Sequence, residues 1–400
     1  MPFEDEIAEL NQAYFFREFT YSNTNFRTRN EDDVEVELEL ADSLLSIEDS
    51  AVIFQLKERE VQGDSTLERE RTWFENKVLR KGTKQVRDTL RYLESEEEIT
   101  LKNHREHEIT LRGSSIANLY KLVVFQGRPE LPDELAKKKY HESNTAGVVH
   151  IIAAEDYKGI ISTLLTPAEF MDYLSYREDL IDLWGEHLNT LPEQALVGHY
   201  IMIGNVEEKP ELRHSYALAM IDHRAEEWDI SVVIRLFADR IIDAESPTGY
   251  YPIISTLAQL NRGDLRQFKQ RYSLSIDAVR ANNQELPYRM AIPRLNCGFI
   301  FIPLTLEEIP HQGELIRALT EAHKYDQRLE KCIGITFSVV EGGGYDVGWC
   351  VINCPWEQDD ELANFIASNR LFREVRTVEE NHYTFNENVV VRRVGGDEQD

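Results

Sequence analysis

The stretch that decides the fold runs from Glu39 to Lys57 and reads ELADSLLSIEDSAVIFQLK. Two short apolar segments are separated by an acidic turn, a pattern typical of two adjacent strands. The run AVIF is apolar at every position, which predicts a strand buried on both faces, as in the centre of a covered sheet. Side chains alternate along a strand, so we expect Gln55 and Lys57 on one face and Leu56 on the other.

The end of this hairpin gathers three kinds of polar group. Asp42 opens the first strand, and Gln55 and Lys57 close the second. An acid, an amide and an amine should therefore lie together. Because lysine is rarely buried without a partner or a task, the hairpin predicts a polar site at one end of an apolar sheet.

The pattern Asp42-x12-Gln55-x-Lys57 resembles the active-site signature of the PD-(D/E)XK nuclease superfamily, in the variant with Gln at the middle position. Members of that superfamily cleave phosphodiester bonds with a bound divalent metal, usually magnesium. The resemblance covers residues 1–190. Ala41 stands where the family's name has Pro, and Gln55 replaces an acid, which removes one metal-binding charge.

The resemblance implies a role for each residue of the pattern. Asp42 would ligate Mg²⁺ or Mn²⁺, together with the amide oxygen of Gln55 and the carbonyl oxygen of Leu56. Lys57 would orient or activate the attacking water and stabilise charge on the phosphate. Hard oxygen ligands of this kind suit both metals.

A further acid is expected from the first helix. Residues 3–21 predict an amphipathic helix with acids in its first turn, where the helix dipole favours them. Glu18 falls at helical spacing from Leu10 and Tyr14, on the apolar stripe. Two interpretations stay open: either its stem packs while its carboxylate reaches water, or it ligates the metal, as an acid of the first helix does in many of these nucleases.

The segment VEVELEL at residues 34–40 alternates apolar and acidic residues, which predicts a strand with one wet face. Such an acidic row is usually solvated. Glu39 is nevertheless close enough to Asp42 in the chain to help hold a metal.

A long helix is expected from residue 65 to residue 93, and one of its faces is basic. The cations on that face are Arg80, Lys84, Arg87 and Arg91. This row is either a solvated face with ion pairs or a surface for phosphate contacts beside the site. Gln85 adjoins the apolar stripe, and the helix is similar to the one after the catalytic hairpin in the superfamily, where a Gln or Lys commonly faces the site.

The chain as a whole predicts an α/β (α+β) protein in three regions. Residues 1–190 alternate strands and helices, which the resemblance identifies with a restriction-endonuclease-like core, a central mixed sheet flanked by helices. Residues 191–290 read as a helical connecting region, and residues 291–400 as a second α+β domain. That domain is expected to serve recognition, assembly or control, through a second copy of the chain or a protein partner.

Composition restricts the partners. A net charge of −28 argues against a protein that coats nucleic acid by bulk electrostatics, so positive surface must be local, or a partner must present the substrate. The N-terminus lacks the features of a signal peptide, and no apolar run is long enough to span a bilayer. We therefore expect a soluble, cytoplasmic protein without a membrane partner. Four cysteines without a CxxC motif favour buried free thiols over a zinc site or disulfides.

The leading hypothesis is a metal-dependent nuclease that acts on nucleic acid, with DNA favoured over RNA. A role in anti-phage defence is implied by the resemblance alone. The main alternative is a catalytically inactive nuclease-fold scaffold or regulatory binding protein. A third interpretation makes Lys57-Glu58-Arg59 a structural ion-pair cluster.

Overall fold

The computed structural model describes residues 1–29, 33–60, 65–240, 246–283, 285–340, 342–372 and 382–386. The chain divides into two compact units. The first comprises Met1–His223 with the C-terminal residues 383–386, and the second comprises Arg224–His382. The division falls inside the predicted connecting region 191–290, whose helices are shared between the two units.

The first unit is mixed α/β. Its helices are α1 (Phe3–Tyr14), α2 (Leu67–Trp73), the π-helix η1 (Phe74–Gly82), α3 (Thr83–Ser95), α4 (Asp133–Ala136), α5 (Ala154–Leu164), α6 (Pro167–Trp184), α7 (Glu193–Met202) and α8 (Tyr216–Met220). Its strands are β1 (Thr20–Ser22), β2 (Asn25–Arg29), β3 (Glu35–Glu39), β4 (Ser43–Ile47), β5 (Ser50–Glu58), β6 (Ile99–Lys102), β7 (Glu108–Leu111), β8 (Asn118–Gln126), β9 (Tyr140–Ser143) and β10 (Gly147–Ala153).

A six-stranded mixed sheet in the order β1-β4-β5-β8-β10-β9 forms the centre of this unit. Strands β4 and β5 are an antiparallel hairpin, whereas β5, β8 and β10 run parallel. All residues of β5 from Ala51 to Lys57 are buried. The predicted central strand covered on both faces is therefore confirmed.

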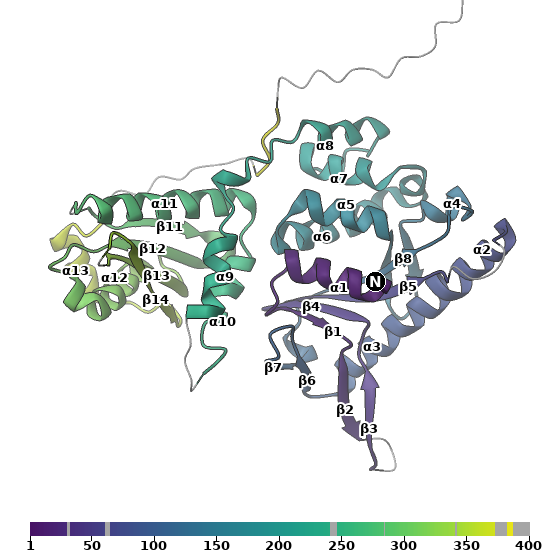
Figure 1. Ribbon diagram of the computed structural model, residues 1–400, viewed down its shortest axis with the longest axis horizontal. Helices are drawn as coiled ribbons and strands as arrows, with labels where there is room; N and C mark the ends of the chain where they lie inside the picture. Colours follow the sequence, from purple (N-terminus) through teal and green to yellow (C-terminus); the bar gives the residue numbers. More distant parts are fainter. Residues whose placement is uncertain are drawn as a thin grey trace, which may run out of the picture. The chain divides into compact units, whose positions relative to one another are not determined.

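Helices cover both faces of the sheet (Figure 1). On one face, Tyr157 of α5 packs edge-on against Phe54 of β5. On the other, Phe74 of η1 packs edge-on against Phe125 of β8. Two smaller hairpins, β2–β3 and β6–β7, complete the unit, and β2–β3 projects from its body in Figure 1.

Two predicted helices differ from the structure. The helix expected over residues 3–21 ends at Tyr14, because Phe16 takes a positive φ of 68° that an α-helix does not allow. The long helix expected over residues 65–93 exists as one run, but its middle third is the π-helix η1. Helix α6 begins with a side-chain cap, since Thr166 accepts a hydrogen bond from the Glu169 amide and Pro167 is the first helical residue.

The second unit contains a four-stranded sheet in the order β11-β12-β13-β14. Its strands are β11 (Tyr288–Ile292), β12 (Cys297–Pro303), β13 (Lys331–Val339) and β14 (Tyr345–Asn353). Its helices are α9 (Ser231–Arg240), α10 (Tyr251–Ala258), α11 (Arg262–Arg280), α12 (Gln312–Asp326) and α13 (Asp360–Asn369). Phe268 of α11 packs against Phe299 and Phe301 of β12, while α12 covers the opposite face.

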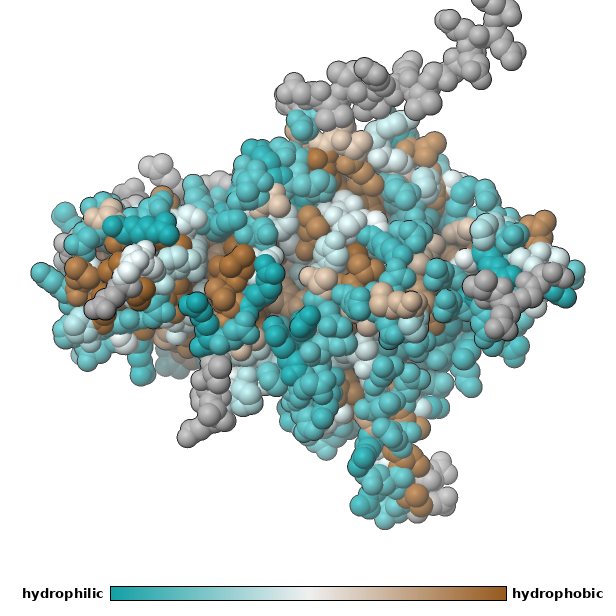
Figure 2. Space-filling view, in the orientation of Figure 1, coloured by the Kyte–Doolittle hydropathy of each residue, from teal (hydrophilic) through white to brown (hydrophobic). Residues whose placement is uncertain are grey.

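The cysteines of this unit are free, but only Cys297 and Cys332 are fully buried, while Cys354 is exposed. Residues 373–381 and 387–400 of the predicted second α+β domain lie outside the described residues. Between these two segments, Phe385 forms a single bridge with Ile221. Hydrophilic residues cover most of the face seen in Figure 2, in keeping with the net charge of −28. Among the described residues, no helix combines the length and the apolar character that crossing a bilayer requires.

Candidate functional site

The register of the central sheet brings the predicted residues together. Ser43, the first residue of β4, pairs with Phe54 of β5, so the preceding Asp42 lies beside Gln55. Gln55 and Lys57 pair with Val123 and Phe125 of β8, whose side chains face the η1–α3 helix. The expectation that strand alternation places both β5 residues on one face is confirmed.

Lys57 is the centre of the cluster. Its ammonium donates to Asp42 Oδ2 at 2.9 Å, to the Leu56 carbonyl oxygen at 2.8 Å and to Gln55 Oε1 at 3.5 Å. The amide of Leu56 also donates to Asp42 Oδ2, at 2.6 Å. A carboxylate, an amide oxygen and a backbone carbonyl thus converge on one cation. The interpretation of Lys57-Glu58-Arg59 as a structural ion-pair cluster is wrong, because Lys57 contacts Asp42 and Gln55 and its side chain is only 9% exposed.

Hydrogen bonds from two other elements fix the chain just before Asp42. The Thr24 hydroxyl donates to the Ala41 carbonyl at 2.6 Å and accepts from the Ala41 amide at 2.8 Å. From α3, the Thr89 hydroxyl donates to the Leu40 carbonyl at 2.5 Å. The backbone of the two residues before Asp42 is therefore fixed by hydrogen bonds from Thr24 and from Thr89, which fixes the position from which the Asp42 side chain points into the site.

Acids that the sequence pattern does not include surround the cluster. Partial burial raises the pKa of Glu4, in the first turn of α1, and the charge of Asp42 raises it further. The pKa of Glu39 is raised by the same two causes, while Lys57 and Lys81 oppose the rise. Glu39 therefore lies in the electrostatic field of Asp42, and its part in holding a metal stays a prediction. Glu4 was missed, although the acids in the first turn of α1 were a visible signal.

Glu18 does not join the site, and its assignment as a metal ligand is corrected. It lies in the connection between α1 and β1, where its carboxylate pairs with Arg105 at 2.7 Å. Strand β1 runs antiparallel to β4, with Thr20 opposite Leu45 and Ser22 opposite Ser43. Glu18 therefore lies toward the end of β4 that is remote from Asp42. Its assignment failed because α1 ends before reaching it.

The helix beside the site carries the other predicted residues. Gln85 precedes Thr89 by one turn of α3, and its Oε1 is buried with no hydrogen-bond partner in the described part of the chain. Arg80, Lys84, Arg87 and Arg91 are all exposed. Arg91 pairs with Asp88 at 3.3 Å, whereas the other three cations form no ion pair within the described ranges.

The π-helix η1 lies directly against the strand next to the site. A Cβ added to Gly82 would lie 2.9 Å from Val123 Cγ2, so only glycine permits this approach. Val123 is the residue of β8 paired with Gln55. π-helical turns are rare and occur frequently at functional sites. The close contact sets the approach of the basic helix to β8, the strand next to β5.

The donor atoms fit a hard divalent cation in their chemistry. Carboxylate, amide and backbone oxygens are ligands that Mg²⁺ and Mn²⁺ accept. The buried, unpartnered Oε1 of Gln85 adds an oxygen on the same side of the sheet. Among the described residues, no group of three or more His, Cys, Asp and Glu side chains is placed to hold a metal. A metal here would therefore rest on Asp42 and neutral oxygens, with Lys57 among them.

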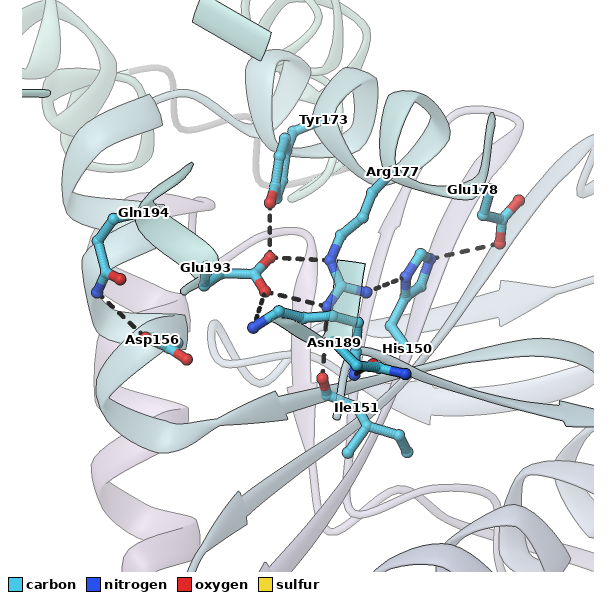
Figure 3. A network of polar contacts seen from close by, with 10 residues as sticks. His150, Ile151, Asp156, Tyr173, Arg177, Glu178, Asn189, Glu193 and Gln194 are labelled. Atoms are coloured by element: carbon cyan, nitrogen blue, oxygen red, sulfur yellow. Dashed lines mark hydrogen bonds and ion pairs between the residues drawn. The ribbon is translucent and has the colours of Figure 1, made fainter. Parts of the chain in front are cut away.

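A second buried polar cluster lies elsewhere in the first unit (Figure 3). Glu193 of α7 accepts from Arg177 Nε at 2.8 Å and from the Tyr173 hydroxyl at 2.6 Å, and it pairs with Lys139 at 3.2 Å. Arg177 also donates to His150 Nδ1 at 2.7 Å. Sequence reasoning missed this network, although Arg177 falls on the apolar stripe of α6.

A functional proposal for this chain has to rest on the chemistry of the site, because the comparisons with known proteins do not provide a function. Comparison with protein-family models, curated proteins and solved structures gives no significant match to this chain.

Proposed function

We propose that this chain is a metal-dependent nuclease that hydrolyses phosphodiester bonds, with DNA as the favoured substrate. The observation that carries the proposal is the convergence of Asp42 Oδ2, Gln55 Oε1 and the Leu56 carbonyl oxygen on one cationic point. Burying these charged and polar groups in an apolar sheet is costly even though they are paired with one another. Mg²⁺ or Mn²⁺ is the cofactor that these oxygens suit.

Each residue has a distinct part in this proposal. Asp42, Gln55 and the Leu56 carbonyl would hold the metal, which supplies Lewis-acid chemistry when bound. Lys57 would place a positive charge where negative charge grows on the phosphate, and would hold the attacking water by a hydrogen bond. Glu39 and Glu4 would attract the metal electrostatically from nearby, because Asp42 is its only carboxylate ligand.

The proposed fold is restriction-endonuclease-like. The support is the order of elements: a first helix, an antiparallel hairpin carrying the site, a helix, and then the parallel strands β8 and β10. The exposed row Arg80, Lys84 and Arg87 beside the site offers local cations for a phosphate backbone, as the net charge of −28 requires.

The test is a cleavage assay on single- and double-stranded DNA and RNA with Mg²⁺, Mn²⁺ or a chelator. We expect cleavage only with metal, and a loss of about a hundredfold or more in Asp42→Asn, which removes the one carboxylate. Glu37→Gln is the matched control, because Glu37 is an exposed acid of β3. Cleavage by Asp42→Asn at the parental rate would contradict the proposal.

One observation favours the alternative, a nuclease-fold scaffold without catalysis. Lys57 already contacts three protein oxygens, and an ammonium has three N–H donors. Such a saturated ion pair is also what a structural role would produce. A protein that binds nucleic acid but cuts none of the four substrates with either metal would establish the scaffold.

A further inference from the structure

We propose that Lys57 is an internal counter-cation that holds the metal-ligand oxygens, so that metal binding and release of the Lys57 ammonium are one linked event. This inference deepens the proposed function, because it concerns the regulation of the same site. It rests on the contacts of a single side chain with its neighbours.

The contacts show that the ammonium and a metal require the same atoms. Lys57 Nζ lies within 2.9 Å of both Asp42 Oδ2 and the Leu56 carbonyl oxygen. Asp42 Oδ2 also accepts the Leu56 amide, so this oxygen already has two donors. Mg²⁺ binds oxygen at about 2.0–2.1 Å. A dication this close to the same oxygens would be repelled strongly by the ammonium, so Lys57 must leave them as the metal binds.

The surroundings explain why the ammonium occupies this position. Gln55 is 1% exposed and Lys57 is 8% exposed, so unpaired oxygens here would have little contact with water. The electrostatic neighbours of Asp42 and Lys57 include Glu4 and Glu39, which makes the site attractive to a cation. The Lys57 ammonium compensates this negative charge with a single positive charge from the chain itself. A divalent ion would compensate it with twice the charge.

Release gives Lys57 a second role. While its N–H groups contact the Asp42, Leu56 and Gln55 oxygens, they are not available to a phosphate. Once released, the same ammonium becomes a donor for the substrate. Metal should therefore bind before the phosphate contact of Lys57 can form, which keeps the site inactive without metal.

The test compares Lys57→Met with Lys81→Met by titrating the full chain with MnCl₂ in a calorimeter. Lys81 is a nearby exposed cation in the field of Glu39, so Lys81→Met removes the same charge without freeing an oxygen. We expect Lys57→Met to bind Mn²⁺ at least about tenfold more tightly than the parent, and Lys81→Met to change affinity less than about threefold. The gain should vanish in Asp42→Asn/Lys57→Met. Equal or weaker binding by Lys57→Met would overturn the inference.

A second measurement needs no variant and therefore does not depend on how Lys57→Met folds. Reductive methylation of the parent, followed by mass spectrometry, reports how accessible each amine is. We expect the rate at Lys57 to rise severalfold in saturating Mg²⁺, while the rate at the exposed Lys84 stays constant. A Lys57 rate that Mg²⁺ leaves unchanged would contradict release.

The cleavage assay separates this inference from the proposed function. If the parent cuts nucleic acid but Lys57→Met gains no Mn²⁺ affinity, the linkage is wrong and the nuclease stands. If the parent cuts nothing while Lys57→Met gains Mn²⁺ affinity, the linkage stands and the nuclease proposal falls.

Discussion

The first unit contains two buried charge clusters that balance their charges differently. In the network of Figure 3, Glu193 and Arg177 are at most 2% exposed and bind each other directly. Lys139 and Tyr173 complete the contacts of the Glu193 carboxylate. In the hairpin site, Asp42 and Lys57 are about one-tenth exposed and have Glu4 and Glu39 as further acids in their field.

The difference appears in the pKa values. Burial alone would raise the pKa of Glu193, but Arg177 and Lys139 lower it to about 2. At the site, burial and the charge of Asp42 raise the pKa of both Glu4 and Glu39. In the network, one buried carboxylate lies against two buried cations, Arg177 and Lys139. The site has surplus negative charge and is suited to taking up a cation.

The largest effect should come from breaking the network. Glu193→Gln leaves Arg177 and Lys139 buried without a carboxylate, which should lower the free energy of unfolding by about 3–5 kcal/mol. Asp42→Asn should change it by less than about 1 kcal/mol, because losing the Lys57 pair is offset by relief of repulsion with Glu4 and Glu39. Denaturant unfolding of both variants measures the two changes. If Glu193→Gln and Asp42→Asn lowered the free energy of unfolding equally, the two clusters would not differ in how their charges are balanced.

The second effect is the pH dependence of the network. Burial lowers the pKa of His150 to about 4, and the nearby Glu178 opposes this only in part. The unfolded chain therefore takes up a proton near pH 6.5, before the folded chain does. Stability from this group is complete above pH 6.5 and falls as the pH drops toward 4, by up to about 3 kcal/mol.

His150→Asn tests this sign. The Asn amide oxygen can accept from Arg177, as His150 Nδ1 does at 2.7 Å, but it does not titrate. We expect the unfolding free energy of this variant to fall less steeply between pH 6.5 and 4 than that of the parent. Parallel curves would mean that His150 already gains a proton in the folded protein near its ordinary pKa.

The third effect concerns the contact between η1 and β8. Gly82→Ala places a Cβ 2.9 Å from Val123 Cγ2, and valine is stiff, so we expect a loss of about 1–3 kcal/mol. Gly159→Ala in α5 is the matched control, because its Cβ would meet nothing within 4 Å. That variant should gain up to about 1 kcal/mol. If the two alanine variants had the same melting temperature, this would contradict the close contact between Gly82 and Val123.

The same regions show what the sequence could reveal. Strand β5 is buried from Ala51 to Lys57, as the run AVIF predicted, because an unbroken apolar run is a local pattern. Asp42, Gln55 and Lys57 converge as predicted, because strand alternation and a short turn fix their geometry.

The failures have equally physical causes. The apolar pattern continues through Phe15 and Phe16, so nothing local announces the end of α1 or removes Glu18 from it. The network joins residues from separate elements, and no spacing rule connects Lys139 to Glu193. The π-helix left no distinct sign in the sequence. Phe74, Val78 and Gly82 are buried at intervals of four residues, but the same interval continues to Val86 of α3 and fits one face of an α-helix equally well.

The smallest effect should come from the basic row, which is exposed where both clusters are buried. Arg80→Gln/Arg87→Gln removes two cations that form no ion pair in the described part of the chain. If each contacts a phosphate, binding should weaken for every sequence, and the salt slope should flatten by about one unit per contact.

An Asp42→Asn background prevents cleavage during the binding titrations. Lys209→Gln/Arg213→Gln, which changes two exposed cations elsewhere in the unit, should leave the slope unchanged because salt screens charges beyond about 8–10 Å. Parallel slopes for parent and Arg80→Gln/Arg87→Gln would mean that this helix face is only solvated, and that an acidic protein holds its substrate by other cations.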